Sequence, residues 1–340
     1  MNKYQLSLCG YEKKNQHSKR GRVGGDTHDD CRGNVAFQVV VKPPLLLGER
    51  LLPGGGWVQI VLAALFGGWL YLQMFDRKRR GVWRRRIWLL FSIVFFSQLF
   101  LGIFVDSVFL MSGKLHFPIP GLIPAGGFYR GEVSFMPFLF LVTILLSGGA
   151  WCSQLCYFGA WDSLAAGKNG KREVPSSKMR SRMRWTVLFV FIGVASALRG
   201  FGVPVIYSTG LAAFAGMVGI MVIGFVSKRR HVAMHCSSYC PAGTLVMYLK
   251  HVSPWRLRLN DRCRHCMACT RVCRYGALSK ADVLKGRPAI NCTLCGDCLA
   301  GCGHDALEYH FWGISPILAE RLWLGTTLVL FTCFLSIARV

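Results

Sequence analysis

Six apolar runs, separated by polar and basic segments, make up most of the chain after residue 50. The first runs from Trp57 to Phe75, and as a helix rising about 1.5 Å per residue it reaches about 28 Å, close to the thickness of a bilayer core. Comparable runs lie at about 87–111, 134–151, 185–206, 210–227 and 322–338. The pattern therefore predicts a polytopic α-helical membrane protein with about six transmembrane helices.

The N-terminal segment lacks this pattern. Residues 1–50 are polar, Gly-rich and mixed in charge, with neither apolar periodicity nor the apolar core and cleavage site of a secretory signal. We expect a disordered basic tail there. Residues 51–253 then form a transmembrane domain, and residues 314–340 add a C-terminal transmembrane helix.

The strong positive charge fits a membrane protein. The chain has 41 Lys and Arg against 16 Asp and Glu, a net charge of +25 that in a soluble protein would suggest a nucleic-acid partner. Here the basic residues gather at the ends of apolar runs, as the positive-inside bias requires, and no fold that reads bases is recognisable. We therefore expect membrane lipid, and no nucleic acid, as a partner.

The same bias predicts the orientation of the helices. Basic residues are dense at 77–86, at 168–184 and at 228–230, whereas the opposite loops, 112–132 and 200–209, together hold two. The dense segments should face the cytoplasm, and with them everything from 228 to about 313.

The spacing of the cysteines indicates which chemistry the chain carries. Twelve of the fifteen cysteines fall into four regular groups, which argues for metal binding and against a disulfide scaffold. Two groups, beginning at Cys152 and Cys236, repeat a C-x3-C pattern, and two, beginning at Cys263 and Cys292, repeat C-x2-C-x2-C-x3-C. The other three, Cys9, Cys31 and Cys333, have no partner at an informative spacing and are given no role.

The longer motif predicts a bacterial-type, α+β two-cluster ferredoxin domain at residues 254–313. In C-x2-C-x2-C-x3-C, three thiolates on one tight loop ligate one cubane and the fourth ligates the other. Crossing the motifs gives two [4Fe-4S] ligand sets: Cys263, Cys266, Cys269 and Cys302 for the first, and Cys292, Cys295, Cys298 and Cys273 for the second. Residues 285–290 and 306–311 read as paired strands of a small hairpin.

A pair of zinc ribbons is the alternative for these eight cysteines. Zinc ribbons use two C-x2-C knuckles well apart, not four closely spaced cysteines twice over, so the spacing favours clusters. The proline that usually follows the fourth cysteine is replaced by Arg274 and Gly303, which removes no ligand.

The C-x3-C pairs, Cys152 with Cys156 and Cys236 with Cys240, are less specific. A C-x3-C spacing puts both thiols of a pair on one face of a helix. Two pairs facing each other would form a further redox or metal site with four thiolates; the alternative is that they are small packing residues at close helix contacts. We favour the thiolate-bound metal centre because the neighbouring residues recur together with the cysteines.

The order of these motifs resembles that of a known family. Spans, Cys152-Ser-Gln-Leu-Cys156, more spans, Cys236-Ser-Ser-Tyr-Cys240-Pro241 and then two ferredoxin motifs resemble the NapH/NosR group of membrane ferredoxins, over residues 84–310. The resemblance implies four core spans in the bacterial inner membrane, cytoplasmic clusters, and electron relay between the quinone pool and partner redox subunits. Tyr157 departs from the family's C-x3-C-P pattern, and the spans at 57–75 and 322–338 are additions to the core.

We therefore expect an electron-transfer subunit without a substrate-converting site of its own. The chain has no Walker loop, no dinucleotide fingerprint after a strand, and no nucleophile and base at a recognisable spacing. Its expected partners are quinone or quinol and another redox subunit, such as a cytochrome, ferredoxin or flavoprotein. The alternative is an iron–sulfur or copper assembly factor for a membrane redox enzyme, with Cu(I) on the C-x3-C thiolates.

Overall fold

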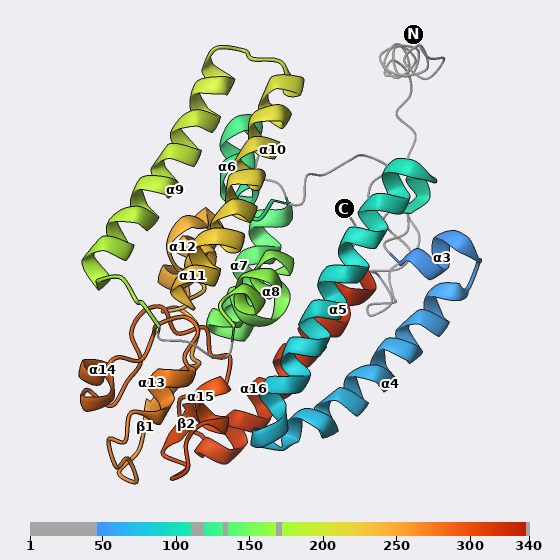
Figure 1. Ribbon diagram of the computed structural model, residues 1–340. Helices are drawn as coiled ribbons and strands as arrows, with labels where there is room; N and C mark the ends of the chain where they lie inside the picture. Colours follow the sequence, from blue (N-terminus) through green and yellow to red (C-terminus); the bar gives the residue numbers. More distant parts are fainter. Residues whose placement is uncertain (1–45, 110–118, 132–134, 168–171, 338–340) are drawn as a thin grey trace, which may run out of the picture. The chain divides into compact units, whose positions relative to one another are not determined.

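The computed structural model describes residues 46–109, 119–131, 135–167 and 172–337. The expected basic tail falls almost entirely on residues 1–45, outside the described residues, and so do Cys9 and Cys31. Within the described part the chain is mostly helical (Figure 1).

Among the residues that the structure describes, six helical segments are long and apolar enough to cross a membrane. The helices that form them are α4 (Gly55–Phe75), α5 (Arg77–Phe104), α7 (Phe135–Ser147), α9 (Ser177–Gly200), α10 (Val205–Met221) and α16 (Pro316–Ile337). Short turns extend two of them: η2 (Gly148–Ala150) and η3 (Trp151–Leu155) follow α7, and η4 (Val222–Ser227) and α11 (Lys228–Arg230) follow α10. All six predicted helices are present.

The start of α5 differs from the sequence-based expectation. We expected the basic segment 77–86 to be a loop, but it forms the first turns of α5, and the connection from α4 is reduced to Asp76. The side chain of Asp76 caps the helix by accepting a hydrogen bond from the Lys78 amide at 2.9 Å. Arg80 and Arg84 are buried here in ion pairs with distant carboxylates, a pairing that local hydropathy does not reveal.

Helices α4, α5 and α16 pack along one another, although α16 lies at the other end of the sequence (Figure 1). Their interface is apolar: Leu70 and Met74 of α4 and Trp323 of α16 are fully buried in one core cluster. Phe91 of α5 lies against Phe331 of α16, with the ring centroids 6.0 Å apart. Packing of this kind fixes α16 beside α5 and so positions the cysteine-rich segment that comes just before α16.

Shorter helices complete the helical part. They are α3 (Leu47–Leu51), η1 (Ser107–Phe109), α6 (Leu122–Arg130), α8 (Tyr157–Ala165), η5 (His235–Tyr239) and α12 (Pro241–Leu249).

A two-stranded sheet closes the cysteine-rich segment. Strand β1 (Arg256–Leu259) pairs antiparallel with β2 (Leu307–His310), in a register that places Leu257 opposite Tyr309. Between the strands lie α13 (Ala268–Val272), α14 (Lys280–Leu284) and α15 (Asp297–Ala300). The second predicted strand is therefore correct, but its predicted partner at 285–290 is wrong. Pro288 in that segment has no N–H for a ladder, whereas β1 alternates buried Leu257 with exposed Arg258.

Candidate functional site

Two cavities lie in the cysteine-rich segment, and four cysteines line each of them. The first is lined by Cys263, Cys266, Cys269 and Cys302, and the second by Cys273, Cys292, Cys295 and Cys298. Each cavity, with the solvent that adjoins it, has an empty volume of about 330 Å³. The structure thus brings together the two sets obtained by crossing the motifs; the clusters they would hold remain a prediction.

The backbone repeats with the cysteines. Three positions in each motif have left-handed φ angles, and they are equivalent in the two motifs: His265 matches Leu294, Met267 matches Gly296, and Gly276 matches Asp305. Four of these six residues are not glycine, so the conformation is costly and is maintained only because the surrounding structure requires it. Helices α13 and α15 also begin at equivalent positions. The motifs are therefore two copies of one ligand loop.

Amide donors point at the last sulfur of each motif. The Ala277 amide donates to the Cys273 sulfur at 3.2 Å, and the Ala306 amide, at the equivalent position of the second motif, donates to the Cys302 sulfur at 3.4 Å. Such donors stabilise a thiolate and raise the potential of a cluster bound to it. The cavities and the donors both fit an iron–sulfur cluster, for which the thiols must lose their protons.

The two cavities differ in their exposure. Cys266 in the first set is exposed, and Cys263 and Cys302 are half-buried. In the second set, Cys273 and Cys298 are buried and Cys292 and Cys295 are half-buried. Burial raises the pKa of the Cys273 thiol to about 11. The first site is thus the more exposed of the two, through Cys266.

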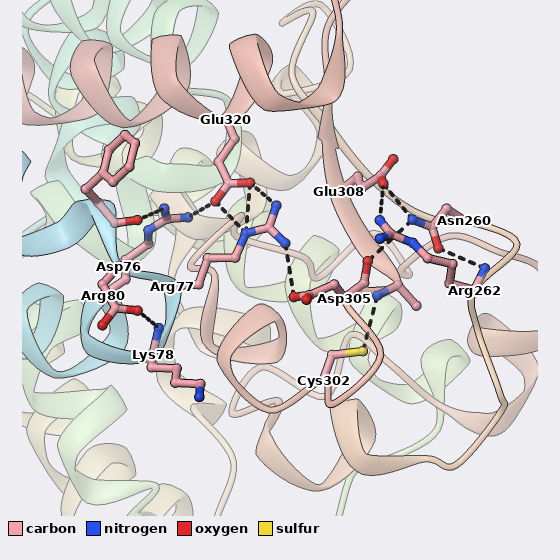
Figure 2. A network of polar contacts seen from close by, with 12 residues as sticks. Asp76, Arg77, Lys78, Arg80, Asn260, Arg262, Cys302, Asp305, Glu308 and Glu320 are labelled. Carbon is pink, nitrogen blue, oxygen red and sulfur yellow. Dashed lines mark hydrogen bonds and ion pairs between the residues drawn. The ribbon is translucent and has the colours of Figure 1, made fainter.

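Salt bridges fix the end of the second ligand loop, which supplies the last cysteine of the first ligand set, to the long helices. Glu320 of α16 accepts from Arg77 and Arg80 of α5, the latter at 2.6 Å, and Arg77 also pairs with Asp305 at 3.3 Å (Figure 2). Asp305 follows Cys302 closely in the sequence, so this network holds the last ligand of the first set in place.

We expected the two cysteines of each C-x3-C pair to lie on one face of a helix, and they do not. Cys152 lies in the π-helical turn η3, and Cys156 leaves the helix with ψ 120° to become the N-cap of α8. Cys236 and Cys240 repeat this arrangement in η5 and α12. A π-helical turn contains more residues than a turn of the α-helix that the sequence pattern implied, so the two cysteines of a pair are offset from each other. Such π-turns are frequent at functional sites.

Glycines at equivalent positions of the two C-x3-C segments make this turn possible. A Cβ on Gly243 would lie 2.6 Å from the Cys236 carbonyl oxygen, and one on Gly159 would overlap the Cys152 carbonyl oxygen. The Gly243 amide donates to the Cys240 sulfur at 3.4 Å. The Cys240 sulfur thus accepts from an amide at the start of α12, whereas Cys156 makes no side-chain cap hydrogen bond. Burial outweighs this donor and raises the pKa of the Cys240 thiol to about 11.

The four C-x3-C thiols are buried and close enough to influence one another. Cys152 and Cys240 pack in one apolar cluster. Burial raises the pKa of Cys236 well above its usual range, and the neighbouring charges of Asp162, Cys152, Cys156 and Cys240 raise it further. Among the described residues, however, no three His, Cys, Asp or Glu side chains converge tightly enough to hold a single metal ion.

Several buried polar atoms without a partner belong to residues that adjoin these cysteines. In the described part of the chain, buried side-chain atoms without a hydrogen-bond partner include Trp151 Nε1, both amide atoms of Gln154, Asp162 Oδ1 and both ring nitrogens of His235. Buried polar atoms are normally satisfied, so a group of them calls for an explanation. A bound polar centre on the C-x3-C thiols would supply one.

Two buried arginines join the C-x3-C turns to the second ligand loop. Arg84 Nη1 donates to the Ser153 carbonyl at 2.8 Å, and Arg84 Nη2 reaches Asp297. Arg184 Nε donates to the Ser237 carbonyl at 2.6 Å, and its Nη2 donates to Asn291. Ser153 and Ser237 each follow the first cysteine of a C-x3-C pair. Nothing in the sequence separates these two arginines from their many basic neighbours, so their role cannot be predicted from it.

Comparison with known proteins agrees with iron–sulfur chemistry. A family model described as a 4Fe-4S binding domain matches residues 131–175 and 209–260. The matched segments contain the two C-x3-C pairs and end before Cys263. Neither the curated proteins nor the solved structures gave a match. The family match supports an iron–sulfur protein of ferredoxin type.

Proposed function

We propose that this chain is a membrane-bound electron-transfer protein that carries two [4Fe-4S] clusters in its cysteine-rich segment. The observation that carries the proposal is the pair of cavities, each lined by three cysteines of one motif and the last cysteine of the other. When bound, the clusters supply one-electron redox chemistry. The chain's own part is to hold them, to direct amide donors at their ligands, and to leave Cys266 of the first site exposed to a partner.

Metal content tests this proposal. Full-length protein purified without oxygen should contain about eight iron and about eight acid-labile sulfide per chain, because each cubane takes four of each. Cys333→Ser is a suitable control, since Cys333 is an exposed cysteine of α16 away from both cavities. Stoichiometric zinc in place of iron, or iron that is unchanged by every substitution of the eight cysteines, would overturn the proposal.

The six apolar helices support insertion into a bacterial inner membrane with the ferredoxin segment in the cytoplasm. In the most apolar stretches of α4, α9 and the α10 segment, few residues are buried by other parts of the described chain, which leaves apolar surface for lipid. The basic residues at the start of α5 lie on the same side as the cysteine-rich segment, which they contact through Arg77 and Arg84.

Lys280→Cys, at an exposed position, should react with a membrane-impermeant maleimide only in inverted vesicles. Labelling in intact spheroplasts would show that the ferredoxin segment faces the periplasm and would contradict the proposed orientation.

The proposed partners are quinol or quinone in the membrane and a redox subunit at the more exposed first site. The resemblance to NapH/NosR-type membrane ferredoxins suggests this pairing, and the exposure of Cys266 supports a protein partner there. In this scheme the chain passes electrons on and converts no substrate itself. Reconstituted protein should show cluster reduction by a quinol analogue, or cluster oxidation by a quinone; the absence of both in cluster-loaded protein would exclude the quinone pool.

A second candidate function uses the C-x3-C thiols as a further metal centre. The family model for 4Fe-4S binding falls on these segments, and the unpartnered polar atoms of residues that adjoin these cysteines favour a bound group. Iron above eight per chain that is lost in Cys152→Ser would support a third redox centre. Stoichiometric copper lost in Cys152→Ser or Cys236→Ser would instead favour the metal-assembly role.

A further inference from the structure

Tyr275 follows the last cysteine of the first motif by two residues and lies deep inside the protein. It is 1% exposed and lines the second cavity together with Cys273 and Cys295. Its carbonyl oxygen accepts hydrogen bonds from Arg180 Nη1 at 3.3 Å and from Asn291 Nδ2 at 3.4 Å. The backbone of Tyr275 is therefore fixed, and its side chain has a defined position.

The same side chain reaches the C-x3-C site. Tyr275 packs in one buried cluster with Ala233 and Cys236, and Cys295 packs against that cluster. Cys236 belongs to the second C-x3-C pair, and Cys295 to the second cluster site. A single aromatic side chain thus packs among residues of both sites.

The hydroxyl group of Tyr275 has no hydrogen-bond partner among the described residues. This is unusual, because a buried tyrosine hydroxyl generally finds one. Tyr309, equally buried and close to the same ligand loop, shows the ordinary case: its hydroxyl donates to the Leu294 carbonyl at 2.7 Å. The Tyr275 hydroxyl is therefore free to bond to a group bound in the cavity that its side chain lines.

We propose that Tyr275 joins the C-x3-C site to the second cluster: its hydroxyl donates a hydrogen bond to a sulfur of that cluster, and an electron passes across its ring between the two sites. The proposal rests on the proposed function and on the C-x3-C centre given above as the second candidate. With both sites loaded, one electron at a time would pass from the reduced centre held by the C-x3-C thiols to the oxidised cluster held by the second set. A quinol would supply two such electrons in succession and release its two protons. In the transfer between the two sites no bond is made or broken, and the tyrosine stays neutral and is not itself oxidised.

The physical basis is contact and charge. Electron tunnelling falls steeply with distance and is faster through packed atoms than across a gap, so a ring packed among residues of both sites shortens the path. A hydrogen bond to a cluster sulfur stabilises the reduced, more negative form and raises the reduction potential. In this proposal Tyr275 acts on the cluster directly, and its ring and its hydroxyl can be tested separately.

Tyr275→Phe removes only the hydroxyl. In anaerobic redox titrations of full-length protein in detergent, followed by EPR, we expect unchanged iron content and a lower potential for the second cluster. A tenfold change in the equilibrium constant corresponds to about 59 mV for a one-electron couple. Tyr309→Phe is the matched control and should leave that potential in place. An unchanged potential in Tyr275→Phe, or an equal shift in Tyr309→Phe, would contradict the proposed hydrogen bond between the Tyr275 hydroxyl and a cluster sulfur.

Tyr275→Leu removes the ring as well. After rapid mixing with a quinol analogue in membranes, reduction of the second cluster should slow at least about tenfold in Tyr275→Leu, and no more than about twofold in Tyr275→Phe once the change in driving force is allowed for. If the second cluster were reduced at equal rates in Tyr275→Leu and wild type, the proposed electron path across the Tyr275 ring would be wrong. If wild-type protein purified without oxygen were found to hold no clusters, the proposed function would be wrong. The two failures can therefore be told apart.

Discussion

Arg84 and Asp297 form an ion pair with 3.0 Å between Nη2 and Oδ2, and both side chains are almost completely buried. Arg84 belongs to α5, whereas Asp297 begins α15 between two cysteines of the second ligand set. The same guanidinium also binds the Ser153 carbonyl next to Cys152. One side chain therefore fixes a long apolar helix, a C-x3-C turn and a cluster loop relative to one another.

Removing Arg84 should destabilise the protein strongly. Arg84→Met would remove the nearest cation from the buried Asp297 carboxylate, which would keep only the longer pairs with Arg85 at 3.6 Å and Arg274 at 3.9 Å. It would also leave the Ser153 carbonyl without its donor, so we expect a cost of about 2 kcal/mol. Unfolding in detergent, followed by circular dichroism, measures the loss, and Arg84→Met/Asp297→Asn should recover part of it. Arg79→Ala breaks a surface pair with Asp76 and should cost less than about 1 kcal/mol. Similar losses in the two single variants would contradict the role given to the buried pair.

The crossed ligand sets make a prediction that a zinc-ribbon arrangement does not. Cys302→Ser should weaken the same EPR signal as Cys263→Ser, although these cysteines belong to different motifs, because both line the first cavity. Cys273→Ser should instead act together with Cys292→Ser on the second signal. Each variant should retain about four iron per chain. If Cys302→Ser affected the same signal as Cys298→Ser, the ligand sets would follow the motifs and the crossing would be wrong.

The glycines of the C-x3-C turns should not tolerate even a methyl group. In Gly159→Ala and Gly243→Ala the new Cβ would overlap a cysteine carbonyl in a backbone that has no room to shift. We expect both variants to lose thermal stability and any metal held by the C-x3-C thiols. Gly193→Ala is the control: nothing lies within 4 Å of its Cβ, and in the middle of α9 alanine should be neutral or stabilising by up to about 1 kcal/mol. Wild-type stability in Gly243→Ala would show that the turn can relax.

What the sequence could predict depended on how locally each feature is encoded. Hydropathy located six helices, and the repeated C-x2-C-x2-C-x3-C motif grouped eight cysteines into the two sets that line the cavities, because spacing within a motif is a local property. The start of α5, the partner of β2 and the buried Arg84 depend on residues far away along the chain, which no local pattern contains. The C-x3-C spacing was itself ambiguous, since it fits an α-helical face as well as a π-turn with a cap.

The C-x3-C thiols allow a final prediction about the route of electrons. If they hold a redox centre between quinol and the ferredoxin clusters, Cys152→Ala and Cys240→Ala should leave both [4Fe-4S] signals intact but prevent their reduction by a quinol analogue in membranes. Dithionite should still reduce the clusters, because it does not need the quinol site. Cys333→Ala, a cysteine of α16 outside every predicted ligand set, should behave like wild type in both assays. Packing cysteines would give a different result: alanine is well accepted at close helix contacts, so normal quinol kinetics in a well-inserted Cys152→Ala/Cys240→Ala variant would assign these thiols to packing alone.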